Sequence, residues 1–592
     1  MEETRLKHAK DFAERATMQS FLNCYLRETA HFHKIIARNE SLASYENIIS
    51  SPLPRQGMEL IIPIKYWSMT GRHLFHFPMY YKVANGALLP LDYVTLTTLI
   101  TKEILLDQNR SGAEDELIMR VMLSKQAIEA SLIERETDSE ALSEGEFEFI
   151  DTEQSLLLGH LLHPTPKSKQ GLSDRDNEKY SPEWKGSFQL HYFSAHPSIV
   201  IEDSNLDLDA SDIIKQELKQ DTGVDQEWLE QFDHLVLIPV HPLQAMNLLE
   251  QEDVQDLLLH GDLQYIGPVG KPFAATSSFR TVYNQDSKYM YKFSVPIKIT
   301  NSLRINQQKE LDRGVEVSRL LSTSFGTELN SRFPGFEIMQ DPAYVNIERV
   351  KGFETVIREN PFYPRSSQST CIAALCQDHA FGGKSRLSSI IHSIARRERR
   401  SLELVSRDWF EKYLDLTLEP MLWLHHKYGL SLEAHQQNSV VTLEEGYPKH
   451  FYYRDNQGYY FSESKASALK AHLPSLNDRS DTICSDEVAV ERFTYYLFFN
   501  HLFGLINGFG SSGLAHEDDL IGLVRTRLSN YEHSEGSPLI NSLLNDPVLS
   551  CKANLLTRLY DMDELVGSLE TQSVYTMVPN PIAKEVHVTY GN

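Results

Sequence analysis

A loop-like segment, Thr276–Thr281 (TSSFRT), concentrates residue types that bind anions. It places three consecutive hydroxyl-bearing side chains one residue before an arginine and a fourth hydroxyl directly after it. Hydroxyl donors and a planar guanidinium suit the recognition of carboxylates and phosphates. An ordinary Ser/Thr turn without a ligand is the alternative for this segment. The segment therefore predicts an anion site only in combination with its neighbours.

The segment that follows, Tyr289–Arg304 (YMYKFSVPIKITNSLR), predicts an extended strand with one apolar and one cationic face. Lys292, Lys298 and Arg304 fall on the same face. Three cations on one face repel each other, so this face is either solvated or neutralised by an anion. Pro296 disturbs the register, because proline favours an edge strand or a bulge.

A polar cluster, Glu433–Asn438 (EAHQQN), follows Gly429, where a helix is expected to end, and precedes a predicted β-hairpin that leads to Asp455. Buried polar groups each require a partner, so core packing explains this cluster poorly. Mg²⁺ prefers oxygen ligands and takes one or two carboxylates beside substrate phosphates. The cluster therefore predicts a metal–phosphate site with Glu433 and Asp455 as metal ligands and Asn438 as a third candidate.

The other motifs point less specifically to a functional role. The histidines of Gly159–Lys167 (GHLLHPTPK) lack the cysteine or carboxylate partners of a zinc site, so we expect them to orient groups at a pocket. Lys552 and Arg558 fit either a site or a surface helix. The GxGxxG pattern at Gly508–Gly513 follows a helical pattern where a dinucleotide fold requires a strand, so we do not expect it to bind phosphate. The arginine-rich run at residues 396–400 predicts a solvated helix face.

The elements that position these motifs form an α+β arrangement. The N-terminal segment predicts an amphipathic helix with Met18, Phe21, Leu22, Tyr25 and Leu26 on its apolar face. Residues 134–148 are acidic and aperiodic, which predicts an exposed connection near a domain boundary. Strand patterns dominate between about 150 and 360, and helical patterns dominate afterwards.

The composition narrows the class of protein. The chain has 57 lysines and arginines against 82 aspartates and glutamates, a formal charge of −25, which argues against a nucleic-acid surface. No apolar stretch is long enough to cross a bilayer, so a soluble cytoplasmic protein is expected. The five cysteines form no CxxC pair and are read as ordinary thiols.

Taken in order, GHLLHPTPK, PVHPLQ, TSSFRT, KFSVPIKITNSLR, EAHQQN, RDNQG and KANLLTRL resemble the IucA/IucC family of siderophore synthetases that work without a nonribosomal peptide synthetase (NIS synthetases). The N-terminal sequence and several of these motifs are most similar to petrobactin-pathway members that join citrate to spermidine. The chain departs from the family pattern at Leu161, Leu243 and Ile305, which affects the expected shape of the pocket.

The resemblance implies a cupped-hand fold with a thumb (residues 1–148), sheet-containing fingers (149–364) and a mostly helical palm with kinase-like β-hairpin elements (365–592). It implies ATP as cosubstrate and Mg²⁺ as cofactor, and it leaves a homodimer open. The residues that it implies for ATP binding are Ser277, Ser278, Arg280, Thr281, Lys292, Gln437, Asn438 and Asp455. Those for citrate binding are His160, Lys167, Thr300, Arg304 and His435, those for catalysis are Arg280, Lys292, Arg304 and His435, and those for the metal are Glu433, Asn438 and Asp455.

The implied reaction joins a citrate carboxylate to the α-phosphorus of ATP and then to a primary amine, with release of pyrophosphate and AMP. His435 or another pocket base is expected to accept the amine's proton. Three alternatives stay open: a synthetase that acts on a substituted citrate or another amine or alcohol, a kinase-like phosphotransferase that releases ADP, and a non-catalytic citrate or polyamine-binding protein. The sequence alone does not identify the amine or the regiochemistry at citrate.

Overall fold

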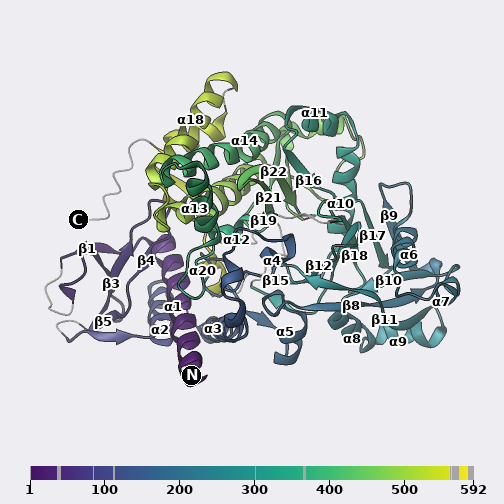
Figure 1. Ribbon diagram of the computed structural model, residues 1–592, viewed down its shortest axis with the longest axis horizontal. Coiled ribbons are helices and arrows are strands. Elements are labelled where there is room, and N and C mark those ends of the chain that lie inside the picture. Colours follow the sequence, from purple (N-terminus) through teal and green to yellow (C-terminus); the bar gives the residue numbers. More distant parts are fainter. Residues whose placement is uncertain are drawn as a thin grey trace.

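The computed structural model describes residues 2–36, 42–83, 86–110, 114–300, 302–364, 368–455, 457–535, 537–560, 562 and 573–583. Helices and strands both occur throughout this part of the chain, and the largest sheet is antiparallel. An N-terminal sheet with long helices, a large antiparallel sheet and a helical C-terminal region lie around a common centre (Figure 1). The predicted α+β class is confirmed.

The N-terminal region packs its helices on a small antiparallel sheet. Its helices are α1 (Glu2–Thr29), α2 (Tyr93–Asp107) and α3 (Glu114–Arg135). Its strands are β1 (His33–Ile35), β2 (Ile48–Leu53), β3 (Met58–Tyr66), β4 (Leu74–Phe75), β5 (Met79–Val83) and β6 (Leu89–Leu91). The predicted apolar face of α1 is confirmed, because all five of its residues are buried in this core. The distant helix α20 (Asn554–Leu559) joins the same core, so the end of the chain returns to its beginning.

The middle region is built on an antiparallel sheet with strand order β10-β8-β11-β12-β13-β18-β17-β9. The strands are β8 (Ser187–Ala195), β9 (Val200–Ser204), β10 (Val236–Val240), β11 (Leu263–Ala275), β12 (Thr281–Tyr283), β13 (Tyr289–Phe293), β17 (Ala343–Ile347) and β18 (Thr355–Glu359). Helices α6 (Ala210–Gln220), α7 (Gln226–Glu230), α8 (Pro242–Leu249) and α9 (Glu252–His260) lie beside it at the right of Figure 1, and α5 (Asp174–Tyr180) lies near the bottom centre.

The predicted continuous strand over Tyr289–Arg304 is wrong, because the segment is divided between two sheets. β13 ends at Phe293, and β14 (Lys298–Ile299) begins a separate sheet with β15 (Ser302–Leu303) and β7 (Lys169–Gln170). Pro296 lies at the break, where its lack of an N–H prevents a continuous ladder. The chain instead folds back, with Val295 N donating to Arg304 O at 2.8 Å. Lys292 therefore lies on a different sheet from Lys298, and Arg304 directly follows β15.

The C-terminal region is mostly helical. It contains α12 (Ile372–Cys376), α13 (Arg386–Glu398), α14 (Leu402–Tyr428), α15 (Ala466–Lys470), α16 (Asp486–Phe493), a π-helix (Thr494–Leu502), α17 (Phe503–Ser511), α18 (Glu517–Glu535) and α19 (Pro538–Asn545). Its strands include β19 (Ser369–Cys371), β20 (Leu430–Leu432), β23 (Tyr459–Ser462), β24 (Ile483–Cys484), β25 (Val548–Lys552) and β26 (Tyr575–Pro579). α14 ends at Gly429 in the left-handed conformation, with φ +64°, as predicted.

The predicted hairpin is confirmed as β21 (Ser439–Glu444) and β22 (Tyr447–Arg454). β22 also pairs in parallel with β16 (Phe336–Met339), which precedes residue 364. Helices α10 (Gln308–Leu321) and α11 (Ser324–Arg332) likewise place apolar residues in the C-terminal core. The packing thus crosses the expected boundary between fingers and palm, and the three-domain division stays a prediction.

Some sequence-based interpretations need correction and others do not. The predicted exposed connection over residues 134–148 is exposed only in part, because Leu142 and Phe147 are buried and the buried Arg386 donates to three backbone carbonyls of this segment. The GxGxxG pattern lies on α17 and the turn after it, as expected.

All five cysteines are buried without disulfide bonds. Within the described ranges, no helix has both the length and the apolar character that a membrane crossing requires.

Candidate functional site

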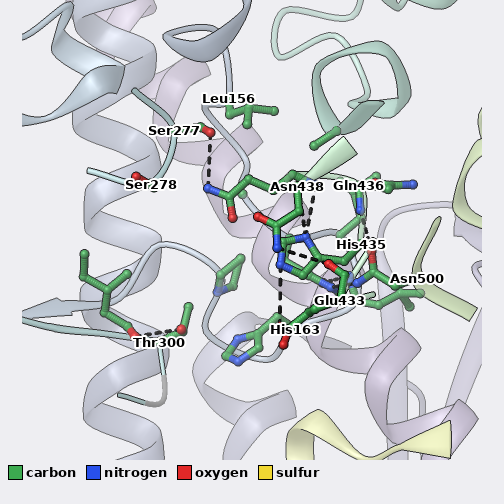
Figure 2. Close-up of a pocket in the computed structure, with 18 of the residues that line it drawn as sticks. Leu156, His163, Ser277, Ser278, Thr300, Glu433, His435, Gln436, Asn438 and Asn500 are labelled. Carbon is green, nitrogen blue, oxygen red and sulfur yellow. Dashed lines mark hydrogen bonds and ion pairs between the residues drawn. The ribbon is translucent and has the colours of Figure 1, made fainter. Parts of the chain in front are cut away.

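Every site residue predicted from the sequence lines one cavity of about 350 Å³. The cavity lies where the three regions meet, and Thr70 and Arg72 of the N-terminal region also face it. Figure 2 shows Ser277 and Ser278 at one side of the pocket, Glu433, His435 and Asn438 at another, and Thr300 at a third. Motifs that are hundreds of residues apart in the sequence therefore form a single site.

One wall of the cavity is the Thr276–Thr281 loop between β11 and β12, and a buried acid fixes it in place. Ser277 donates its backbone N–H and its hydroxyl to Glu153 Oε2, at 3.0 and 2.8 Å. Arg454 Nη2, at the end of β22, donates to both oxygens of the same carboxylate, at 2.8 and 3.0 Å. Glu153 ends the short helix α4 (Phe149–Glu153) and has a side chain that is 0% exposed. It joins the loop to the hairpin.

Sequence reasoning missed Glu153. The available signal is a carboxylate at the start of the apolar stretch EQSLLLG, where a charged side chain requires a partner if it is buried. The partner is 301 residues away, so no local pattern points to it. Gln437 completes the arrangement by donating from Nε2 to the Ser277 hydroxyl at 3.2 Å.

At the centre of the cavity Lys292 forms an ion pair with Asp455, with 3.1 Å between Nζ and Oδ1. The Lys292 side chain is buried, and the Asp455 side chain is 13% exposed. Burial lowers the pKa of Lys292 to about 8, against the opposing effect of Asp455. Burial alone would raise the pKa of Asp455, but Lys292 and Arg358 outweigh it and lower this pKa well below its usual range. The cation predicted on β13 is therefore neutralised by the protein itself.

The three candidate metal ligands lie together. Asn438 Nδ2 donates to Asp455 Oδ2 at 3.2 Å and to the backbone oxygen of Glu433 at 3.1 Å. Burial and the nearby charge of Asp455 raise the pKa of Glu433 to about 7, and Tyr460 donates to its Oε2 at 3.0 Å. Two carboxylates that are only partly exposed and repel each other, with an amide oxygen beside them, fit a hard divalent cation.

Among the described residues no group of three His, Cys, Asp or Glu side chains forms a metal site without external ligands. Mg²⁺ does not need one, because it keeps waters and takes part of its coordination from substrate phosphates. The residues present therefore fit Mg²⁺ bound together with a phosphorylated ligand better than a zinc site made entirely by the protein.

His435 is held as a neutral hydrogen-bond donor. Its Nδ1 accepts the backbone N–H groups of Gln437 and Asn438, both at 3.2 Å, which leaves the proton on Nε2. Burial lowers the pKa of His435 to about 4. These contacts favour His435 as a hydrogen-bond donor over the expected role as a proton acceptor, since Nδ1 is already occupied and the ring presents an N–H, and its role in the reaction stays a prediction.

The opposite wall carries the residues expected to bind citrate. β7 pairs with β14, and Thr300 N donates to Ser168 O at 3.2 Å, which brings Lys167 beside Thr300. Arg304 Nη2 donates to Thr300 Oγ1 at 3.3 Å. Lys167 forms a close ion pair with the buried Glu183, another residue that sequence reasoning missed.

The remaining motifs divide into lining and structural residues. His160 lines the cavity and contacts Asn500 of the π-helix, and burial lowers its pKa to about 3. His241 of PVHPLQ caps α8 through its Nδ1 and packs against aromatic rings. Lys552 lines the cavity, whereas Arg558 is buried beside Glu116, so the surface-helix alternative for this segment is wrong.

The cavity is strongly electropositive, although the chain is acidic. Ten lysine and arginine side chains line it, against three acidic ones. Those cations are Arg27, Arg72, Lys167, Lys169, Arg280, Lys292, Arg304, Arg358, Arg454 and Lys552. Such a lining favours polyanionic ligands, and it strengthens their electrostatic interactions because it is largely withdrawn from water.

Known proteins resemble the chain over nearly its whole length. The IucA / IucC family matches residues 148–377, and the family described as ferric iron reductase FhuF-like transporter matches residues 407–567. The spermidine-citrate ligase of Bacillus anthracis is 45% identical, over 98% of this chain and 100% of its own length. The rhizobactin siderophore biosynthesis protein RhbC of Rhizobium meliloti (strain 1021) is 35% identical, over 96% of this chain and 97% of its own length.

A solved structure agrees with these matches. The ATP-bound aerobactin synthetase IucA from a hypervirulent pathotype of Klebsiella pneumoniae superposes with a TM-score of 0.87, at 28% identity, covering 96% of this chain and 100% of that chain. The fold described above is thus shared over both matched regions.

Glu153 gives a test of how the cavity is held together. Glu153→Gln leaves Arg454 buried without its counter-charge, so we expect the free energy of unfolding in urea to fall by about 3 kcal/mol. Glu146→Gln removes an exposed carboxylate from the preceding segment and should change it by less than about 0.5 kcal/mol. Equal stabilities for the two variants would contradict this role of Glu153.

Proposed function

Because the chain belongs to the IucA / IucC family of siderophore synthetases, we propose that it is an ATP-dependent ligase that joins citrate to a primary amine of a polyamine such as spermidine. The observation that carries this proposal is the single electropositive cavity in which the anion-binding and metal-binding motifs meet. The name and 45% identity of the Bacillus anthracis spermidine-citrate ligase support the substrates.

ATP would lie along the wall formed by Ser277, Ser278, Arg280 and Thr281, with its phosphates near Lys292. The ATP-bound state of the similar aerobactin synthetase supports a nucleotide in this fold. Gln437 and Asn438 line the same side of the cavity. Glu433, Asn438 and Asp455 would hold Mg²⁺, which when bound neutralises phosphate charge.

Citrate would bind at the opposite wall, where Lys167, Thr300 and Arg304 come together, with His160 and His435 nearby. These groups offer ammonium, hydroxyl and guanidinium donors for three carboxylates. The neutral His435 would donate its Nε2 hydrogen to an oxygen of the reacting groups. It would thereby stabilise negative charge without taking up a proton.

In the first step a citrate carboxylate oxygen attacks the α-phosphorus of ATP, the bond to the bridging oxygen breaks, and pyrophosphate leaves. In the second step the uncharged amine attacks the acyl carbon, AMP leaves with the bonding electrons of the acyl–oxygen bond, and the proton lost from the amine nitrogen passes to the departing phosphate oxygen or to water. Both first-step reactants are anions, so the main contribution of Arg280, Lys292 and Arg304 is to hold them together and stabilise charge on the phosphoryl group.

The products distinguish this function from the alternatives. Incubation of the protein with ATP, Mg²⁺, citrate and spermidine should release AMP and pyrophosphate in equal amounts with one citryl amide. ADP would instead indicate a phosphotransferase, and no nucleotide product would indicate a binding protein. Turnover with a half-substituted citrate but not with citrate would indicate a later step in siderophore assembly.

Two basic residues should be essential. Lys292→Ala or Arg304→Ala should lower kcat/KM for citrate-dependent AMP formation about 100-fold or more, because each removes a charge-assisted contact to the reacting anions. Lys288→Ala, at an exposed lysine just before β13, and Arg349→Ala, at a side chain that is 89% exposed, are the matched controls. Near-native AMP formation by the first two variants would rule out the proposed roles.

The metal requirement should depend on pH. Glu433 has a pKa of about 7, so its carboxylate is protonated as the pH falls below that value and then binds Mg²⁺ poorly. We expect the Mg²⁺ concentration for half-maximal AMP release to rise about tenfold between pH 8 and pH 6, as for one competing proton.

Glu433→Gln serves as the control for protonation of ATP itself. The variant should need more Mg²⁺ at both pH values. Between pH 8 and pH 6 it should lack the part of the rise in half-maximal Mg²⁺ concentration that comes from protonation of Glu433. A wild-type enzyme with the same half-maximal Mg²⁺ concentration at pH 6 and pH 8 would argue against Glu433 as a ligand.

A further inference from the structure

A buried carboxylate separates two lysines on the citrate side of the cavity. Glu183 pairs closely with Lys167 through Oε1, and with Lys169 through Oε2 at 2.9 Å. The three side chains are only 5%, 11% and 10% exposed, respectively, and all line the cavity. Burial favours neutral Glu183, yet the two lysines outweigh it and lower its pKa well below the usual range. The group therefore carries a net positive charge.

The two lysines differ in how many of their N–H groups remain available to a ligand. Lys169 Nζ donates to Glu183, to Asn177 Oδ1 at 3.1 Å and to Ser181 Oγ at 2.8 Å, which accounts for its three N–H groups. Within the described ranges, Glu183 is the acceptor that Lys167 Nζ contacts. Two of the three N–H groups of Lys167 are therefore available to an anion in the cavity.

The backbone around this group is fixed by α3. Lys167 N donates to Ser124 Oγ at 3.0 Å, and Arg135 Nη1 donates to the backbone oxygen of Glu183 at 3.2 Å. Glu183 sits in a single helical turn that Pro182 opens, which restricts its backbone further. Both ends of the Lys167–Glu183 pair are thus held by one rigid helix.

We propose that Glu183 is a positioning residue that aims the Lys167 ammonium at a citrate carboxylate, with Lys169 acting as the anchor of Glu183 and not as a ligand. Lys169 orients the carboxylate, the carboxylate orients Lys167, and Lys167 acts beside Thr300 and Arg304, which directly follow β14 and β15. This inference rests on the proposed function, because it takes citrate as the anion at this wall.

The test is a double-mutant cycle in citrate-dependent exchange of pyrophosphate into ATP, a reaction that needs no amine. Glu183→Gln should raise the KM for citrate roughly tenfold to a hundredfold, as loss of a charged hydrogen bond would, and leave the KM for ATP within about twofold. Glu183→Asp, which keeps the charge, should restore part of the citrate affinity. Lys167→Met should raise the citrate KM similarly.

The decisive comparison is Glu183→Gln in the Lys167→Met background. If Glu183 acts through Lys167, the second substitution adds little, whereas two independent effects multiply. An unchanged citrate KM in Glu183→Gln, or multiplying effects, would overturn the inference. Glu178→Gln, at an exposed carboxylate on α5, is the matched control and should behave as wild type.

Two further measurements distinguish a variant that fails to fold, and a failure of the proposed function, from a failure of this inference. If Glu183→Gln does not fold, because it leaves two buried lysines facing each other, Glu183→Gln combined with Lys169→Met restores the charge balance and should show the same citrate defect. Normal citrate affinity in that folded double variant would also overturn the inference. Absence of citrate-dependent exchange in the wild-type protein would instead refute the proposed function.

Discussion

The structure depends on keeping a dense group of cations buried at the centre of an acidic chain. Removing a charge from water is costly, and the cost is recovered only when a partner with good geometry is present. Buried acids supply that partner at four points: Glu153 holds Arg454, Glu183 holds two lysines, Asp341 holds Arg358 in a two-pronged pair, and Asp455 holds Lys292. The net charge of −25 gives no indication of this interior.

The same pairs join the parts of the molecule. The Glu153–Arg454 contact joins the α4 segment to the β21–β22 hairpin, and the Lys292–Asp455 contact joins the large sheet to the segment after that hairpin. Because these acids neutralise only part of the charge in the cavity, the remainder is available to anionic ligands. Donors that are fixed before a ligand arrives need little reorganisation during the reaction, which is the usual source of electrostatic catalysis.

Much of this arrangement could be predicted from the sequence. The buried face of α1, the end of α14 at Gly429, the hairpin and the residue types of the cavity follow from periodicity, glycine conformation and local chemistry. The break at Pro296 was anticipated only as a disturbed register. Glu153 and Glu183 were missed, because local patterns do not show that Glu153 pairs with Arg454 or that Glu183 pairs with Lys167 and Lys169. The π-helix that presents Asn500 also has no sequence signal of this kind.

The electropositive cavity also affects the protonation state of the amine substrate. An acidic chain is only a weak reason to expect a polyamine, and a cavity lined by ten cations against three acids repels an ammonium ion. Nearby positive charge lowers the pKa of an amine, since it disfavours the protonated form. In the proposed reaction, pyrophosphate takes negative charge out of the cavity just before the amine attacks. Its departure would therefore favour the uncharged, nucleophilic amine at the step that needs it, which reduces the need for a dedicated base and agrees with His435 being held as a donor.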